Sequence, residues 1–339
     1  MTGRTVRWML SLLRPPGTLR DAGAARLTIV RHHRVYADGE RPLYRLGVSE
    51  SVFAAQVEVL AREGLAPVTV SEGLARLAAG RPGHTIAMSF DDGYADNVWR
   101  ALPRLQAVGG HATFYLTAGL MEERRAPWWD ELAHALERAR EPHVPAALWN
   151  GDRDLPLATA AGRRAALAQL VPRMRVAPAE RDRRLAALRL RLGVPGAAEC
   201  ELASWDVAQA LVRAGMELGA HTLSHPHLTT VDADEQAREI AGSVELVERR
   251  LGPRPTGLAY PGGDYDATTL AVVARLGLGH AVTTRAGVNA PGAPVYELLR
   301  RGLSEGACTG PSGRLSRRLT LAELGGAFDR LRAPREAAS

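Results

Sequence analysis

Short apolar runs alternate with amphipathic helical segments along most of the chain. The predicted strands are 27–31, 85–90, 112–117, 216–221, 256–260, 280–284 and 297–303. The predicted helices are 49–63, 71–79, 97–108, 205–214, 233–250, 267–276 and 319–332. Repeated strand–helix units are typical of parallel α/β folds. Their number favours a (β/α) barrel, distorted or incomplete.

The alternation is interrupted between residues 127 and 200. This stretch contains a tryptophan pair, a predicted helix near 130–140 and an Arg- and Ala-rich region with helical periodicity. We interpret it as a helical insertion that packs over the barrel. The predicted organisation is an N-terminal segment at 1–26, the first part of the barrel at 27–126, the insertion at 127–200 and the second part of the barrel at 201–335.

Composition limits the classes of function only weakly. The chain has 339 residues and is 46% hydrophobic, which is enough for a globular core. Its 43 basic residues are all arginine and exceed the 37 acidic residues, so attraction to anionic glycans, membranes or nucleic acid is permitted. No basic run is interleaved with aromatic residues, so no nucleic-acid partner is predicted. Cys200 and Cys308 match no zinc-ligand spacing, and we expect two separate thiols.

The N-terminal segment carries a short apolar run at residues 8–13, between arginines. The run is too short to span a membrane, and no clear signal-peptide cleavage site follows it. We expect an ordinary helical turn there, with an amphipathic surface anchor as the alternative. The expected location is therefore cytoplasmic or membrane-peripheral.

Side chains with metal-binding and acid–base chemistry follow two of the predicted strands. Asp91 and Asp92 come directly after one strand, and His221 and His225 come after another. Loops after parallel strands share one face of a barrel, so these residues can meet. Two imidazoles four residues apart, with one carboxylate, can hold a divalent ion if the segment turns helically. The alternatives are a polar loop for the histidines and an Asp-Gly turn for the carboxylates. The neighbouring His227 is expected to be structural.

Three segments of the chain resemble the motifs of one known family. Residues 89–94 (SFDDGY), 221–225 (HTLSH) and 258–263 (LAYPGG) are similar to the first three motifs of the polysaccharide deacetylases. This family is also called the NodB-homology family or carbohydrate esterase family four. The resemblance extends from about residue 27 to residue 303, apart from the insertion. It implies a barrel of the NodB-homology type.

The resemblance also implies a metal-dependent N-deacetylase. Asp92, His221 and His225 would hold a divalent ion, most commonly Zn²⁺ in this family, with Co²⁺, Ni²⁺ or Mn²⁺ as alternatives. Asp91 would be the base that deprotonates a water bound to that ion.

Further site residues follow from the same resemblance. A backbone N–H near Gly262 would help to stabilise the oxyanion. Arg300 resembles a family arginine that orients the catalytic aspartate, although a surface arginine is the alternative. The Trp-Trp-Asp segment beginning at Trp128 is common in a branch linked to exopolysaccharide modification. Tryptophans can stack on sugar rings, and buried packing is the alternative here. The predicted substrate contacts are Tyr94, Tyr260, Trp128 and Trp129.

The general acid is where this chain departs from many family members. They supply it from a late Leu-x-His segment, and no histidine follows His280 here. His280 itself precedes a predicted strand, which would place it at the wrong end of the barrel. Residues 29–35 (IVRHHRV) are similar to a Tyr-His-Arg-Val motif of the exopolysaccharide-linked branch. We therefore predict His33 as the acid, with His32 standing where that branch often has tyrosine; the alternative is that the two adjacent histidines only cap the strand.

The predicted function is metal-assisted removal of N-acetyl groups from an amino-sugar glycan. The expected partner is an N-acetylated glycan, and a peripheral membrane association is left open. One alternative is a metal-dependent amidase or esterase acting on a small molecule. Another is a catalytically impaired homologue that binds glycan without turnover. A nucleic-acid-binding protein ranks far behind these.

Overall fold

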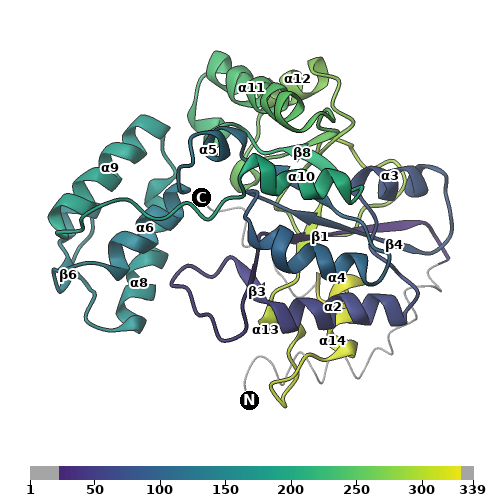
Figure 1. Ribbon diagram of the computed structural model, residues 1–339, viewed down its shortest axis with the longest axis horizontal. Coiled ribbons are helices and arrows are strands. Elements are labelled where there is room, and N and C mark those ends of the chain that lie inside the picture. The colour runs from purple at the N-terminus through teal and green to yellow at the C-terminus, as the bar shows by residue number, and fades with distance from the viewer. Residues whose placement is uncertain (1–22, 330–339) are drawn as a thin grey trace.

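The computed structural model describes residues 23–329, and a parallel sheet forms the centre of the molecule (Figure 1). Its seven strands lie in the order β10-β9-β8-β5-β4-β1-β11. Their bounds are β1 (Arg26–His32), β4 (His84–Phe90), β5 (Thr113–Leu116), β8 (Glu217–Ala220), β9 (Gly257–Ala259), β10 (His280–Val282) and β11 (Arg300–Gly302). Every predicted strand is present, and several are shorter than predicted.

The sheet curves until its two edges nearly meet. β1 and β4 pair along their whole length in parallel register. β4 is buried at almost every position, as expected for a parallel strand covered on both faces. The edge strand β10 reaches the segment before β11 through a bridge between Val282 and Leu298. The prediction of a distorted, incompletely closed (β/α) barrel is therefore confirmed.

Helices surround the sheet, with α11 and α12 on one side and α2 and α14 on the other (Figure 1). Their bounds are α2 (Glu50–Arg62), α3 (Val70–Ala78), α4 (Leu102–Gln106), α5 (Ala118–Glu122), α10 (Trp205–Arg213), α11 (Ala233–Leu251), α12 (Ala267–Arg275), α13 (Glu305–Cys308) and α14 (Arg317–Leu324). The predicted helix at 97–108 begins with a π-helical turn (Asn97–Ala101) before α4. The last helix ends at Leu324, earlier than the predicted residue 332.

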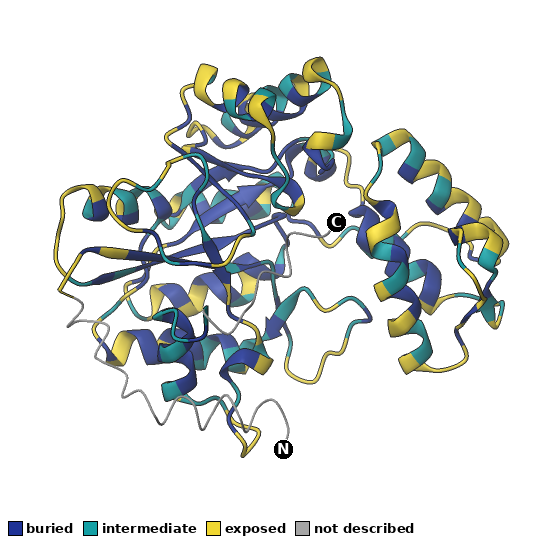
Figure 2. Ribbon diagram, turned by 180° about the vertical axis from the view of Figure 1, so that it is seen from behind, coloured by how far each residue is buried: buried dark blue, intermediate teal, exposed yellow. Residues whose placement is uncertain are grey.

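The helices between residues 128 and 191 lie to one side of the barrel. They are α6 (Trp128–Glu137), α7 (Ala146–Trp149), α8 (Ala160–Leu170), the 3-10 helix η3 (Val171–Met174) and α9 (Pro178–Arg191), with a small hairpin of β6 (His143–Val144) and β7 (Leu155–Pro156). Their apolar faces turn toward one another and form a hydrophobic cluster of their own (Figure 2). Leu43, from the loop between β2 (Arg34–Tyr36) and β3 (Gly47–Ser49), joins that cluster. The insertion is therefore anchored to the barrel partly through this loop.

Some expectations concern the ends of the chain and the thiols. Most of the predicted N-terminal segment at 1–26 lies outside the described residues, and the boundaries at 127 and 200 stay predictions. Among the described helices, none combines the length and hydropathy needed to cross a bilayer. Cys200 and Cys308 are free thiols, as expected.

Candidate active site

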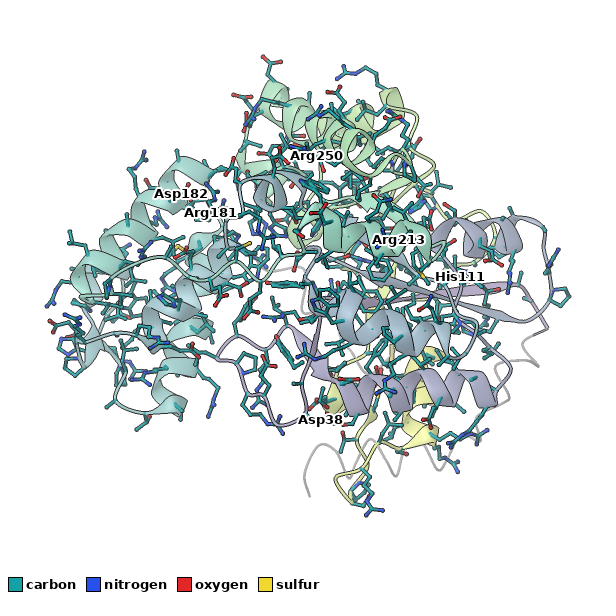
Figure 3. The ribbon with its side chains drawn as sticks, in the orientation of Figure 1. Asp38, His111, Arg181, Asp182, Arg213 and Arg250 are labelled. Atoms are coloured by element: carbon teal, nitrogen blue, oxygen red, sulfur yellow. The ribbon has the colours of Figure 1, made fainter. Side chains whose placement is uncertain are left out.

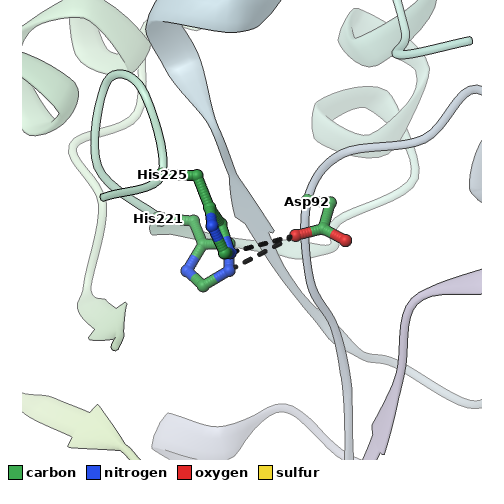
Figure 4. A group of neighbouring side chains, drawn as sticks. All are labelled: Asp92, His221 and His225. Carbon is green, nitrogen blue, oxygen red and sulfur yellow. Dashed lines mark ion pairs between the residues drawn. The ribbon is translucent and has the colours of Figure 1, made fainter. Parts of the chain in front are cut away.

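Three side chains from two strand ends converge at the mouth of the barrel (Figure 4). Asp92 follows β4, whereas His221 and His225 follow β8. Asp92 Oδ1 lies 3.4 Å from Nε2 of His221 and 3.7 Å from Nε2 of His225. The three ligand atoms lie within 4.8 Å of one another, and all three residues are buried. The fold thus brings together Asp92, His221 and His225, the predicted metal-ligand group. Their role as metal ligands stays a prediction.

The loop between the two histidines is not helical, unlike the geometry considered from the sequence. Thr222 and His225 have φ angles of 64° and 55°, in the left-handed region, and Asp92 has a φ of 75°. Such conformations cost a non-glycine residue about 1–3 kcal/mol and persist where the surroundings hold them. Here they turn both imidazoles toward Asp92.

Two charged residues from different parts of the fold hold this loop. Glu239 of α11 accepts hydrogen bonds from the backbone N–H groups of Leu223 and Ser224, at 2.8 and 2.9 Å. Arg181 of α9 donates to the carbonyl oxygen of His225 at 3.3 Å, and only 1% of Arg181 is exposed. Figure 3 shows Arg181 at the junction between the insertion and the barrel. The position of the loop therefore depends on the barrel and on the insertion together.

The chemistry of the three side chains fits a divalent cation. His221 Nδ1 lies 2.7 Å from the carbonyl oxygen of Ala259. A carbonyl only accepts, so Nδ1 carries the proton and Nε2 presents its lone pair toward Asp92. The buried Asp92 oxygens accept no hydrogen bond from the described residues, which is costly unless a cation compensates the charge. Two nitrogen ligands and one oxygen ligand form a set suited to zinc and similar metals.

The two histidines titrate differently. Burial would lower the pKa of His221, but the approach of Asp92 to within 3.4 Å and the charges of Asp91 and Asp92 outweigh it, and the pKa is raised. Burial and the neighbouring His221, His227 and Arg181 hold the pKa of His225 well below its usual value. His225 is therefore neutral, the form in which imidazole binds metals.

Asp91 is held by a buried arginine from the edge strand β11. Nη1 and Nη2 of Arg300 donate to its two carboxylate oxygens at 2.6 and 2.7 Å, and Arg300 Nε donates to the carbonyl oxygen of Thr283 at 2.8 Å. Burial would raise the pKa of Asp91, but the charge and hydrogen bonds of Arg300 outweigh it and hold the pKa well below its usual range. Asp91 is therefore ionised and fixed in orientation, the contact that the family resemblance implies for Arg300.

His32 is the last residue of β1, and His33 follows it. Their side chains point in opposite directions, because side chains alternate along a strand. His33 Nε2 lies 3.9 Å from Asp91 Oδ2, and 23% of the His33 side chain is exposed. Burial lowers the pKa of His33, and the charges of Asp92 and Asp91 offset part of that effect. The ring of His32 packs in the core against Phe53 and Phe90. Only His33 therefore reaches the cavity.

His227, which we expect to be structural, is buried at the edge of the cavity. Its Nδ1 lies 2.6 Å from Oδ2 of Asp264. Gly262 lies directly beneath it with a φ of +65°, and a Cβ there would come within 2.4 Å of the His227 ring. Glycine at position 262 is thus required for the close approach of the His227 ring to the backbone of the third motif segment, residues 258–263.

A chain of aromatic contacts links the insertion to the metal-ligand group. The rings of Trp129 and His225 are 4.4 Å apart. Trp129 Nε1 donates to the hydroxyl of Tyr94, which donates to Asp130 Oδ2, both at 2.8 Å. Tyr94 is 1% exposed and does not line the cavity, so its predicted direct contact with substrate does not fit its position. Trp128 and Trp129 are mostly buried but line the cavity.

A cavity of about 370 Å³ opens above these groups. The barrel contributes the residues around the metal-ligand group, together with Gly262 and Tyr260. The hydroxyl of Tyr260 donates to the carbonyl oxygen of Tyr296 at 2.9 Å, so its ring packs within the barrel wall. The loop between β2 and β3 and the insertion contribute Tyr44, Leu46, Trp128, Trp129, Val171 and Arg175. The cavity is thus a slot between the barrel mouth and the inserted helices.

Sequence comparison identifies the class of protein. The chain matches the polysaccharide deacetylase family over residues 78–281, more than half of its length. It belongs to that family, as its motifs indicated. It is 30% identical over 79 residues to chitin deacetylase 1 of Cryptococcus neoformans var. grubii and 29% identical over 92 residues to YxkH of Bacillus subtilis. The first stretch covers 23% of this chain and 17% of its relative, and the second covers 27% and 33%. Each match therefore spans a third or less of the relative's length.

Solved structures extend the likeness to most of the chain. Streptococcus pyogenes deacetylase PplD aligns with a TM-score of 0.56 and 19% identity, over 83% of this chain and 93% of that one. IcaB from Ammonifex degensii aligns with a TM-score of 0.55 and 19% identity, over 88% and 97% of the two chains. At these identities the likeness defines the fold.

Proposed function

We propose that the protein is a metal-dependent N-deacetylase of an amino-sugar glycan. The observation that carries this proposal is the convergence of Asp92, His221 and His225 beside the Asp91–Arg300 pair, in a chain of the polysaccharide deacetylase family. A divalent ion held by those three residues, most commonly zinc, would supply Lewis-acid activation of water and of the acetamide carbonyl.

Asp91 acts as the base in this proposal. It takes a proton from the water that attacks the acetamide carbonyl carbon, while Arg300 keeps it ionised and correctly turned. A backbone N–H near Gly262 stabilises the oxyanion. The C–N bond then breaks, and the amine leaves with a proton from His33.

The short distance between Asp91 and His33 supports this pairing of roles. Their nearest side-chain atoms are 3.9 Å apart, which is longer than a hydrogen bond, so in this proposal one water molecule carries the proton between them. A carboxylate with a low pKa releases a captured proton readily. Passing that proton to His33 supplies the acid form that burial disfavours. The products are acetate and a free amino sugar.

Acetate release from a panel of N-acetylglucosamine oligomers and polymers tests the proposal. We expect release by the zinc-restored enzyme, none after chelation, and recovery with zinc, cobalt or nickel. Binding of glycan without acetate release, at a full equivalent of metal, would instead support a protein that binds without turnover. Release that is unaffected by chelation would contradict the metal role.

A further inference from the structure

The backbone around His33 is held on both sides, although the chain leaves the main sheet at this point. The carbonyl oxygen of His32, the last residue of β1, accepts a hydrogen bond from the backbone N–H of Asp91 at 3.0 Å. The carbonyl oxygen of His33 accepts one from Nδ2 of Asn97 at 2.8 Å. Each peptide unit next to the Cα of His33 is thus hydrogen-bonded. Because peptide units are planar, holding both of them sets the φ and ψ angles of His33 and the direction of its side chain.

Asn97 is a buried polar residue that the proposed reaction does not use. It begins the π-helical turn, and 1% of it is exposed. Its Nδ2 donates to the carbonyl oxygen of His33 and, at 2.9 Å, to Oδ1 of Asp96. Both partners accept, so both N–H groups of the amide are used. Its Oδ1 is buried without a hydrogen-bond partner among the described residues, a cost that an apolar side chain of similar volume would avoid.

Asp96 orients the amide of Asn97 and also holds the residues that follow the proposed acid. Its Oδ1 accepts from the backbone N–H of Val35 at 3.0 Å, and its Oδ2 accepts from Nε of Arg34 at 2.8 Å. Only 4% of Asp96 is exposed. Asp96 and Asn97 come directly after the first motif, whereas their partners belong to the segment at 29–35. The two residues therefore join the motif of the proposed base to the segment of the proposed acid.

We propose that Asn97 is a positioning residue for the acid His33. This inference rests on the proposed function. Asn97 does not line the cavity, so it acts through the backbone of His33 and not on the substrate. The ring of His33 makes no hydrogen bond within the described residues, and 23% of the side chain is exposed, so its backbone decides where the ring lies. Asn97 keeps that ring 3.9 Å from Asp91, within reach of one bridging water.

Asn97→Leu tests the role, because leucine has a similar volume and no donor. Acetate release from an N-acetylglucosamine oligomer needs the acid, whereas zinc-dependent hydrolysis of an aryl acetate does not, since phenolate leaves without a proton. We expect kcat for the amide to fall by about tenfold, part of the roughly 10²-fold that an acid contributes, and ester hydrolysis to fall much less. In a His33→Ala background, Asn97→Leu should have almost no further effect on the amide, because the two residues act as a unit.

Gln56→Met is the matched control. Gln56 of α2 is fully buried, its Nε2 donates to the carbonyl oxygen of Leu303 at 2.9 Å, and its Oε1 has no partner among the described residues. It does not line the cavity. Its substitution should lower stability and leave the ratio of amide to ester hydrolysis unchanged. If circular dichroism shows that Asn97→Leu does not fold, Asn97→Ser replaces it, with the same selectivity expected at a smaller size.

A crystal structure of the zinc-loaded Asn97 variant gives a readout that does not depend on turnover. We expect Nε2 of His33 to move away from Oδ2 of Asp91 while the metal-ligand group keeps its positions. Equal losses on the amide and the ester, or a full further loss in the His33→Ala background, would overturn the positioning role. An unmoved His33 ring would overturn it as well. Acetate release from no sugar by the wild type would contradict the proposed function separately, and the crystal structure would still decide this inference.

Discussion

The barrel and the helical insertion share one cavity but contribute to it in different ways. The barrel places Asp91, Asp92 and His221 at the ends of strands of one parallel sheet, where backbone hydrogen bonds fix their positions. The insertion has a hydrophobic cluster of its own and reaches the site only through side chains. Trp129 packs on the ring of His225, and Arg181 binds its carbonyl oxygen. In the proposed mechanism the barrel supplies the reacting groups, whereas the insertion contacts the loop of His221 and His225 and lines the cavity.

Substitutions in the barrel and in the insertion should therefore differ in the size of their effect on activity. Removing a barrel side chain should eliminate a step of the reaction. Removing an insertion side chain should weaken metal or substrate binding by a limited factor. Variants on the two sides of the cavity can break or sharpen that distinction.

The largest effect is expected from the double variant His221→Ala/His225→Ala. Only Asp92 of the proposed ligand set would remain, so bound zinc and acetate release should both fall to background. Metal content after dialysis, measured by atomic emission, checks the first result. His111→Ala is the matched control, because His111 is exposed and precedes β5, at the opposite end of the barrel (Figure 3). A full equivalent of zinc in the double variant would exclude this site.

Asp91→Asn should retain zinc yet lower kcat by about 10²–10⁴-fold, the usual contribution of a general base. It also leaves the buried Arg300 without its charged partner, which costs up to about 3–5 kcal/mol in the free energy of unfolding. Kinetics must therefore be measured well below the unfolding transition, with circular dichroism as the check on folding. An unchanged kcat in the folded, zinc-loaded variant would remove Asp91 from the mechanism.

His33→Ala tests the acid, with an expected loss of about 10²-fold on an acetamide substrate. An aryl acetate provides the control reaction, because its phenolate leaves without needing a proton. Hydrolysis of that ester should fall much less than hydrolysis of the amide. Equal losses on the two substrates would point to a structural role for His33, and no loss on either would assign the acid elsewhere.

Arg181→Met moves the comparison to the insertion. Residues that hold metal ligands in place typically contribute about 10–100-fold to metal affinity, so the zinc Kd should rise by that factor. Arg183→Met on the same helix is the control, because Arg183 is exposed and pairs only with Glu180 among the described residues. Competition with a chromogenic chelator measures both. Equal zinc affinity in the two folded variants would confine Arg181 to packing of the insertion.

The features of the barrel could be predicted from the sequence more completely than those of the insertion. The barrel strands and the group of Asp92, His221 and His225 could be predicted, because each motif lies next to an apolar run and parallel strand ends share one face. The place of His227 beside the cavity depends on the turn after β8, which residue spacing alone does not define. No local sequence pattern marks Arg181 or Tyr44. Their positions depend on how the insertion docks, which side-chain packing between distant segments decides.

Asp130→Asn probes the junction itself and should have the smallest effect on activity. Burial raises the pKa of Asp130 to about 7, although the hydrogen bond from Tyr94 opposes the shift. The folded state therefore holds a proton that the unfolded chain releases near pH 4, and stability falls as the pH rises from about 4 through 7.

Asparagine keeps an acceptor for Tyr94 and removes this titration. The wild type should therefore lose up to about 4 kcal/mol of unfolding free energy between pH 4 and pH 8 through this group, a loss that the variant should not show. Urea unfolding at the two pH values measures this, with the exposed Asp152→Asn in the same insertion as control. A pH dependence equal to that of the wild type would mean that the Asp130 carboxylate is solvated and that the insertion docks on the barrel less tightly than the contacts of Tyr94 and Trp129 indicate.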